Sequence, residues 1–158
     1  MTATTGGLVG AARTIASAAH AGQVDKNGAP YVGHPAAVAA LLERQGASEV
    51  EVAAGWLHDV VEDTDVNLDD LRRDLSPYAT PGDVERVCSI VDLLTRRPHE
   101  PSGRYYERIA ADPQARAVKL ADIAHNTDPA RMALVDAADP TTADRLRAKY
   151  ARAVEALR

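Results

Sequence analysis

The chain has 158 residues, a formal net charge of −5 and a single cysteine, Cys88. This length predicts one domain, the negative charge argues against general nucleic-acid binding, and a lone cysteine excludes an intrachain disulfide framework. No apolar run reaches the roughly 20 residues that span a bilayer, and residues 1–7 lack the basic start of a signal peptide. We therefore expect a cytoplasmic protein with neither a membrane nor a nucleic acid as its partner.

Helical patterns follow one another along the chain, and no segment has a convincing strand pattern. Glycine and proline residues predict an ordered loop over residues 22–33, and Ser48 with Glu51 forms a capping-box signal. Pro129 marks either a break or the first turn of a new helix. The remaining helices are expected over residues 9–20, 34–46, 48–61, 67–75, 80–94, 102–111, 113–126 and 141–157. The sequence therefore predicts an all-α bundle of seven to nine helices.

Polar residues interrupt two of the apolar helical segments. His58 and Asp59 lie within residues 55–61, and Asp122 lies within residues 118–124, where the neighbouring side chains are largely apolar. An ionised carboxylate that is buried alone is costly, so each aspartate needs a positive partner. Imidazole and carboxylate groups together suit a divalent first-row metal, and His34 at the start of its own helix could complete such a site.

Helical spacing adds further polar groups to this cluster. Residues four apart share a helix face, which pairs His58 with Glu62, Asp59 with Asp63, and Asp122 with Asn126. Each feature alone has an ordinary explanation: a His-Asp dipeptide is common, and an acidic run is usually a solvated helix end. The occurrence of all of them together favours a functional site.

The order His34, His58-Asp59, Asp122 resembles the HD superfamily of metal-dependent phosphohydrolases. Longer segments are similar to the hydrolase domain of RelA/SpoT alarmone enzymes, and most of all to its stand-alone form, the small alarmone hydrolases. These segments are residues 19–23, 26–35, 57–64 and 118–122, with Asn126. The resemblance covers about residues 8–132. We expect residues 1–158 to form one HD-type domain, with residues 141–157 as a C-terminal packing helix.

The resemblance implies an HD-type helical fold, one divalent metal, usually Mn²⁺, and removal of the 3′-pyrophosphate from ppGpp-like nucleotides. Matching motif positions would make Glu62 and Asp63 the groups that position or activate the attacking water. Asn126 would contact the nucleotide, and Lys26 would lie near its base or phosphates. The metal ligands implied in the same way are His34, His58, Asp59 and Asp122.

Other candidate substrate contacts come from residues 104–108. Arg108 could neutralise substrate charge, and Tyr105 could either stack on a base or pack in the core. The main departure from the family pattern is Asp25, because relatives commonly carry an arginine there that is expected to stack on guanine. An aspartate cannot stack in this way and has the wrong charge for a phosphate.

Two other functions remain open at this point. One is a phosphatase or phosphodiesterase that acts on another nucleotide or phosphorylated metabolite, and the departure at Asp25 keeps it open. The other is a non-catalytic HD module that binds a nucleotide, although such a module need not keep both Glu62 and Asp63. The sequence also leaves open the native metal, the base preference and whether the chain forms a homo-oligomer.

Overall fold

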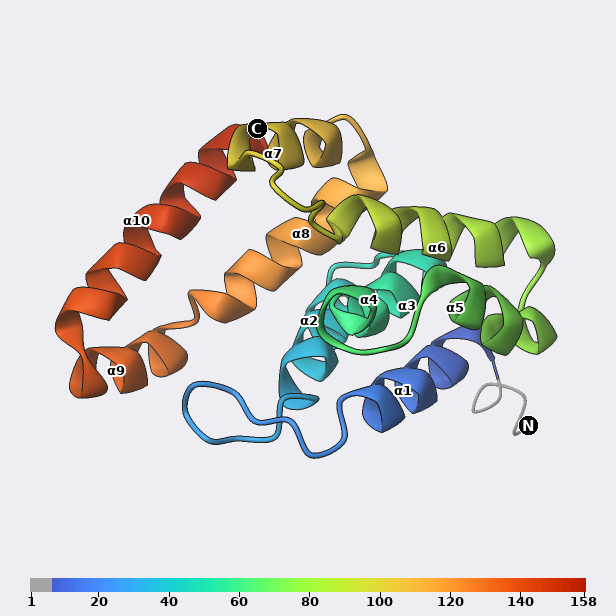
Figure 1. Cartoon of the computed structure of the whole chain (residues 1–158), viewed down its shortest axis with the longest axis horizontal. Coiled ribbons are helices and arrows are strands. Elements are labelled where there is room, and N and C mark those ends of the chain that lie inside the picture. The colour runs from blue at the N-terminus through green and yellow to red at the C-terminus, as the bar shows by residue number, and fades with distance from the viewer. Residues whose placement is uncertain (1–6) are drawn as a thin grey trace.

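The computed structural model describes residues 7–158, which form ten α-helices, one short 3₁₀ helix and connecting loops (Figure 1). Within this part of the chain there is no strand, so the predicted all-helical fold is confirmed. The expectation about a signal peptide falls almost wholly on residues 1–6, which lie outside the described residues. In chain order the helices are α1 (Leu8–Ala19), α2 (Gly33–Arg44), α3 (Glu49–Leu57), α4 (Val60–Asp63), α5 (Leu68–Leu75), η2 (Ser76–Tyr78), α6 (Pro81–Leu94), α7 (Ser102–Ala110), α8 (Pro113–Asn126), α9 (Pro129–Ala138) and α10 (Pro140–Ala156).

The helix expected over residues 48–61 is wrong in one respect, because it is divided at His58 and Asp59 into α3 and the single turn α4. At the division, the His58 ring nitrogen Nδ1 lies 2.7 Å from the carbonyl oxygen of Gly55 and bonds to it. This hydrogen bond occupies the Gly55 carbonyl oxygen, which in a continuous helix would accept a backbone N–H from the next turn. Adjacent residues on a regular helix point about 100° apart, whereas here both side chains reach one centre.

Three Asp-Pro pairs determine where the last three helices begin. Asp112, Asp128 and Asp139 are the N-caps of α8, α9 and α10, and each accepts hydrogen bonds from backbone N–H groups of the first turn. The proline that follows each aspartate occupies the first helical position, where its missing N–H costs little. Pro129 is thus the first turn of a new helix rather than a simple break.

Helix α3 lies at the centre of the packing, against α1, α2, α6 and α8. The core is aliphatic, and its largest fully buried side chains include Leu42, Leu57 and Ile90. Gly55 lets α2 approach α3 closely, because a Cβ atom at this position would lie 2.8 Å from Leu42 Cδ1. Cys88 is buried in the same core, as its apolar setting predicts.

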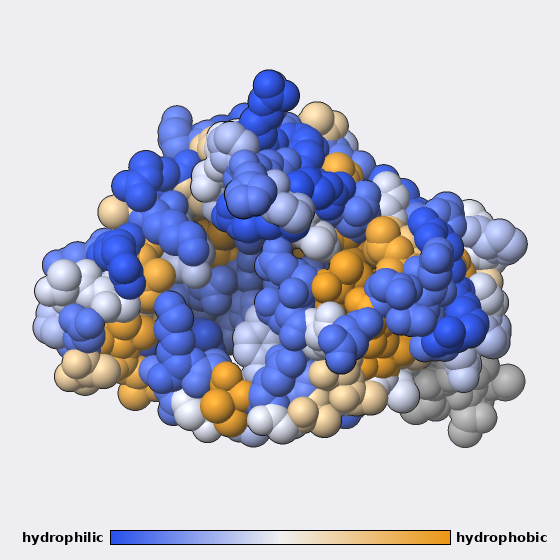
Figure 2. Space-filling model, viewed as in Figure 1, coloured by the Kyte–Doolittle hydropathy of each residue, from blue (hydrophilic) through white to orange (hydrophobic). Residues whose placement is uncertain are grey.

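Helices α9 and α10 form an arm at the left of Figure 1, on the side away from α1 and α5. Helix α10 packs against α7, α8 and α9. A recess with a mostly hydrophilic surface separates this arm from the centre of the molecule (Figure 2). Among the described helices, none is both long enough and apolar enough to cross a membrane.

Candidate active site

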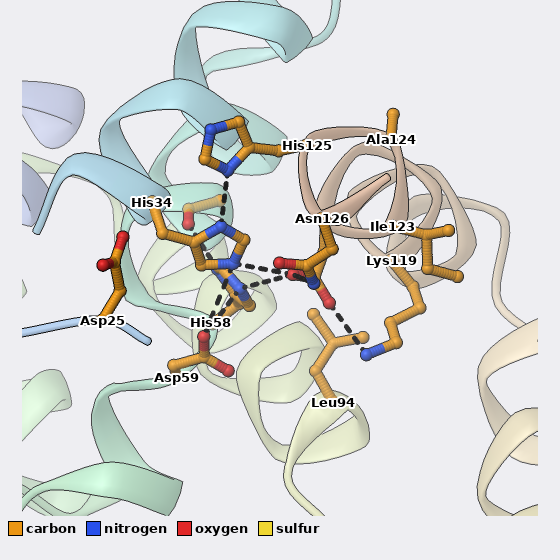
Figure 3. Close-up of polar contacts among 12 residues, drawn as sticks. Asp25, His34, His58, Asp59, Leu94, Lys119, Ile123, Ala124, His125 and Asn126 are labelled. Carbon is orange, nitrogen blue, oxygen red and sulfur yellow. Dashed lines mark hydrogen bonds and ion pairs between the residues drawn. The ribbon is translucent and has the colours of Figure 1, made fainter. Parts of the chain in front are cut away.

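Four polar side chains from three separate parts of the sequence, His34, His58-Asp59 and Asp122, meet in the interior. Figure 3 shows His34, His58 and Asp59 pointing toward one another. His34 Nε2 lies 2.7 Å from Asp122 Oδ1, and His58 Nε2 lies 3.0 Å from Asp59 Oδ2. The cross distances are also short, with 3.8 Å between His34 Nε2 and Asp59 Oδ2 and 3.4 Å between His58 Nε2 and Asp122 Oδ1. His34, His58 and Asp122 are buried, so the cluster belongs to the core rather than to the surface.

The histidine His58 has the features of a metal ligand. Its Nδ1 bonds to the Gly55 carbonyl, which leaves Nε2 as the nitrogen with the lone pair. Nε2 is buried and makes no hydrogen bond of good geometry within the described residues. A buried, unpartnered nitrogen that faces two carboxylates is the arrangement that a cation would satisfy.

The charge distribution leads to the same conclusion. Burial opposes a positive charge on His58, but Asp59 and Asp122 outweigh it and raise the pKa of His58 well above its usual value. A positive charge at Nε2 is therefore favoured, and it can be either a proton or a bound metal that takes the place of the proton. Burial likewise favours neutral Asp59, but His58 outweighs it and lowers the pKa of Asp59 to about 2. Burial also favours neutral Asp122, but Lys119, His34 and His58 outweigh it and lower the pKa of Asp122. The surroundings therefore hold two carboxylates ionised around a common point, and the residues fit a divalent metal.

Further contacts fix two members of the cluster. Lys119 Nζ donates to Asp122 Oδ2 at 2.8 Å, and Asn126 Nδ2 donates to Asp122 Oδ1 at 3.1 Å. His34 Nδ1 lies 2.7 Å from His125 Nδ1, so one of the two rings donates a hydrogen bond to the other. Such outer contacts orient ligands, and those of Asp122 and His34 come from the same face of α8.

Glu62 and Asp63 lie one turn beyond the division between α3 and α4, and both are exposed. A carboxylate oxygen from each lies within 4.8 Å of one of Asp59. Glu62 Oε1 accepts a hydrogen bond from the backbone N–H of Arg96 at 2.8 Å, which leaves its other oxygen available. Burial together with the charges of Asp59 and Glu62 raises the pKa of Asp63.

Tyr31 connects the loop before α2 to this acidic group. Its hydroxyl donates to Asp59 Oδ2 at 2.6 Å and lies 3.4 Å from Asp63 Oδ2. Burial and the nearby carboxylates raise the pKa of Tyr31, so the hydroxyl keeps its proton and acts as a donor. The sequence placed this residue inside a matching segment but did not assign it a role.

The cluster opens into a cavity of about 380 Å³, a volume typical of small-molecule sites. One end carries His34, Asp59, Glu62, Asp63 and Asp122. The opposite wall is largely apolar and comes from α9 and α10, through Met132, Val135, Leu146 and Tyr150. The predicted substrate contacts Lys26 and Asn126 both line this cavity.

Asp25 lines the same cavity, but its carboxylate is engaged. Oδ1 accepts hydrogen bonds from the backbone N–H groups of Asn27 and Ala29, and Oδ2 lies 3.4 Å from Nη1 of Arg131. The aspartate thus organises the loop over residues 22–33. A guanidinium does reach this part of the cavity, but it comes from α9 and not from position 25.

The structure does not bring Arg108 into the large cavity. Its guanidinium forms an ion pair with Glu100 at 2.7 Å and donates to the carbonyl oxygens of Leu93 and Thr95. Tyr105 is buried, donates to the Leu94 carbonyl at 2.7 Å and lines a smaller cavity beside the cluster. Of the two alternatives for Tyr105, packing in the core is the one that this position favours.

The comparisons with known proteins agree with the motifs. The family described as "HD domain" matches residues 12–152. A Synechocystis protein named "Probable guanosine-3′,5′-bis(diphosphate) 3′-pyrophosphohydrolase" is 39% identical over 125 residues, which are 77% of this chain and 16% of that protein. SpoT of Escherichia coli K12, named a bifunctional (p)ppGpp synthase/hydrolase, is 32% identical over 116 residues, which are 71% of this chain and 16% of SpoT. The chain therefore spans about a sixth of the length of these relatives.

One solved structure extends the comparison to the fold. It is a metazoan ortholog of SpoT, described as a protein that hydrolyses ppGpp and plays a role in starvation responses. The two structures agree with a TM-score of 0.71 over 96% of this chain and 85% of that chain, at 24% sequence identity. At this identity the likeness shows a shared fold. Together with the match over residues 12–152, these findings confirm the predicted resemblance, and the chain belongs to the HD-domain family.

Proposed function

We propose that this protein is a metal-dependent hydrolase that removes the 3′-pyrophosphate from ppGpp-like nucleotides. One observation carries the proposal: His34, Asp59 and Asp122 of the cluster line a cavity whose wall from α9 and α10 is largely apolar, and His58 lies within 3.4 Å of both carboxylates. That arrangement suits a substrate with a phosphorylated end and a nucleoside end. The names of the relatives support the same substrate class.

The four cluster residues would hold one divalent metal, for which we propose Mn²⁺. Imidazole and carboxylate ligands suit this ion, and the buried Nε2 of His58 supplies a donor that is otherwise unpartnered. When bound, such a metal polarises a phosphate oxygen and makes a water molecule more acidic.

The protein's own groups would act on the water and the nucleotide. Glu62 has one oxygen free to orient the attacking water and accept its proton, while its other oxygen is held by the Arg96 N–H. The water oxygen then bonds to the phosphorus next to the ribose, and the bond between that phosphorus and the ribose 3′-oxygen breaks. The 3′-oxygen takes up a proton, equal to the one that Glu62 accepted, and leaves as the ribose 3′-hydroxyl. Asn126 and Lys26 line the path between the metal end and the apolar wall, where they would contact the nucleotide.

A phosphatase acting on a different nucleotide remains the second candidate, and one observation favours it. The pair of Asp25 and Arg131 lies where the family pattern has a single arginine, so the base would meet a different surface. We also retain as proposals a cytoplasmic location and one HD-type domain over residues 1–158.

The test is product release from a substrate panel of ppGpp, ppApp, NADPH and nucleoside monophosphates, each with Mn²⁺ and with EDTA. We expect Mn²⁺-dependent release of pyrophosphate from the 3′-pyrophosphorylated nucleotides. Release of orthophosphate from another compound would keep the metal site and replace the substrate. If the metal binds but no compound is hydrolysed, the proposed activity on these nucleotides is wrong.

A further inference from the structure

A second, smaller cavity of about 140 Å³ lies directly beside the candidate metal site. It shares Asp59, Glu62, Asn126 and Tyr150 with the large cavity and also borders His58. The shared part of its wall carries the carboxylates of Asp59 and Glu62, whereas the remaining wall is positively charged. That wall contains Leu94, the two tyrosines Tyr105 and Tyr106, and three cationic side chains, namely Arg96, Lys119 and Lys149.

The three cations come from separate parts of the fold: Arg96 follows α6, Lys119 lies on α8 and Lys149 lies on α10. Lys119 is paired with Asp122. Within residues 7–158, by contrast, neither Arg96 nor Lys149 has a carboxylate within ion-pair distance. The Arg96 guanidinium carbon instead lies 4.1 Å from the centre of the Tyr105 ring, and Lys149 Nζ lies 5.3 Å from that of Tyr150.

These charges are close enough to affect one another. Burial and the charges of Arg96, Lys119 and Lys26 lower the pKa of Lys149. Two cations without carboxylate partners therefore face one small cavity. Like charges that converge in this way are stabilised by a bound anion.

The segment that carries Arg96 is held in place. Its backbone N–H donates to Glu62 Oε1 at 2.8 Å, so the segment is fixed directly to Glu62, the proposed catalytic base. Arg108 also holds this segment, by an ion pair with Glu100 and by hydrogen bonds that it donates to the carbonyl oxygens of Leu93 and Thr95. Arg108 therefore acts as a positioning residue for the small cavity.

We propose that Arg96, Lys119 and Lys149 form a subsite for the terminal phosphate of the substrate's pyrophosphate group. The inference rests on the proposed function, because it takes the phosphorus next to the ribose to lie at the metal cluster. The second phosphate must then lie beside the cluster, and the small cavity is next to it and cationic. The nucleoside extends the other way, toward the apolar wall formed by Met132, Val135 and Leu146.

The test uses Arg96→Gln and Lys149→Gln, which remove charge but keep polar side chains of similar shape. The matched control is Arg152→Gln, since Arg152 is an exposed cation on α10 three residues from Lys149 and is absent from the lining of both cavities. Binding of inorganic pyrophosphate to the Mn²⁺-loaded full-length protein is measured by calorimetry after free metal has been removed. We expect each test variant to weaken this binding about tenfold, the scale of one lost charge-assisted contact. The control should change it less than twofold, and metal content should be equal in all four proteins.

A kinetic experiment tests whether the cations bind the 3′-pyrophosphate or the 5′-phosphates of the substrate. Guanosine 3′-diphosphate with a free 5′-hydroxyl is compared with ppGpp, and kcat/KM should fall about tenfold in both test variants for both substrates. An effect that disappears when the 5′-phosphates are absent would overturn the assignment, since the cations would then serve the 5′ group. An equal loss in the Arg152→Gln control would also overturn it, because overall charge alone would explain the result.

The two proposals can fail separately. If pyrophosphate binding depends on Arg96 and Lys149 but no 3′-pyrophosphorylated nucleotide is hydrolysed, the anion subsite stands and the proposed function falls. If ppGpp is hydrolysed with unchanged kcat/KM in both variants, the function stands and the subsite falls.

Discussion

The two ends of the large cavity are built in different ways. At the inner end lie His34 and Asp122, which belong to helices of the core and are buried together with their neighbour His58. The outer end is formed by the loop before α2 and the arm of α9 and α10, with partly exposed residues such as Asp25 and Arg131. A polar residue in a core is costly and therefore stands out in a sequence, whereas a charged residue on a surface is ordinary. The candidate metal ligands are thus visible in the sequence, and the residues that would select the substrate are not.

The largest effect should follow a change at the inner end. We expect Asp59→Ala to abolish metal binding and turnover together, because Asp59 faces His58 and is bonded to Tyr31. Metal content by atomic absorption and activity with Mn²⁺ are measured on the same preparation. Asp65→Ala is the control, since Asp65 is an exposed acid two residues past Asp63 and belongs neither to the group of His34, His58 and Asp59 nor to that of Asp59, Glu62 and Asp63. An Asp59→Ala protein with full metal content and activity would remove the residue from the site.

A smaller but still large effect should follow Glu62→Gln. Glutamine can still accept the hydrogen bond from the Arg96 N–H, so the local structure should persist while the base is lost. We expect normal metal content and a fall in kcat of about 10²-fold, the usual scale for a positioned acid or base. A kcat equal to that of the wild type would show that another group activates the water.

At the outer end the effect should be modest. Asparagine at position 25 can keep the hydrogen bonds from Asn27 and Ala29 but loses the negative charge that faces Arg131. Since an anionic substrate then meets less repulsion, we expect Asp25→Asn to lower KM about two- to fivefold with kcat unchanged, the scale of a partly exposed ion pair. The effect should shrink at high salt. A higher KM would show instead that the carboxylate itself contacts the nucleotide.

The difference between the two ends of the cavity also explains which features of the structure could be predicted from the sequence. The helices, the Asp-Pro helix starts and the meeting of His34 with Asp122 follow from periodicity, capping and the cost of a buried charge. The division at His58 could not be predicted in this way, because it depends on a side-chain bond to Gly55.

The sequence pattern says least about the roles of basic residues near the surface. Arg108 and Lys149 are both basic residues on amphipathic helices, and nothing in their spacing separates one that holds a loop from one that faces a cavity. Only the position of each helix in the fold distinguishes them. Whether a basic residue faces a binding site therefore depends on how its helix packs, and the spacing of residues in the sequence does not give this.

The smallest effect concerns the close contact that supports the inner end. Gly55→Ala places a methyl group 2.8 Å from Leu42 Cδ1, a side chain that is itself fully buried. Overpacking of this kind costs about 1–3 kcal/mol, and the better helix propensity of alanine returns up to about 1 kcal/mol. We expect the free energy of unfolding in urea to fall by about 1 kcal/mol relative to the wild type.

Gly82→Ala is the matched control, because Gly82 lies in the first turn of α6 with open space around its Cα atom. That variant should keep the propensity gain without the packing cost, so its free energy of unfolding should equal or exceed that of the wild type. The difference between the two variants measures the packing cost alone. If Gly55→Ala were as stable as Gly82→Ala, Leu42 could move aside freely, and the close approach of α2 to α3 would not be needed to hold His34 against His58.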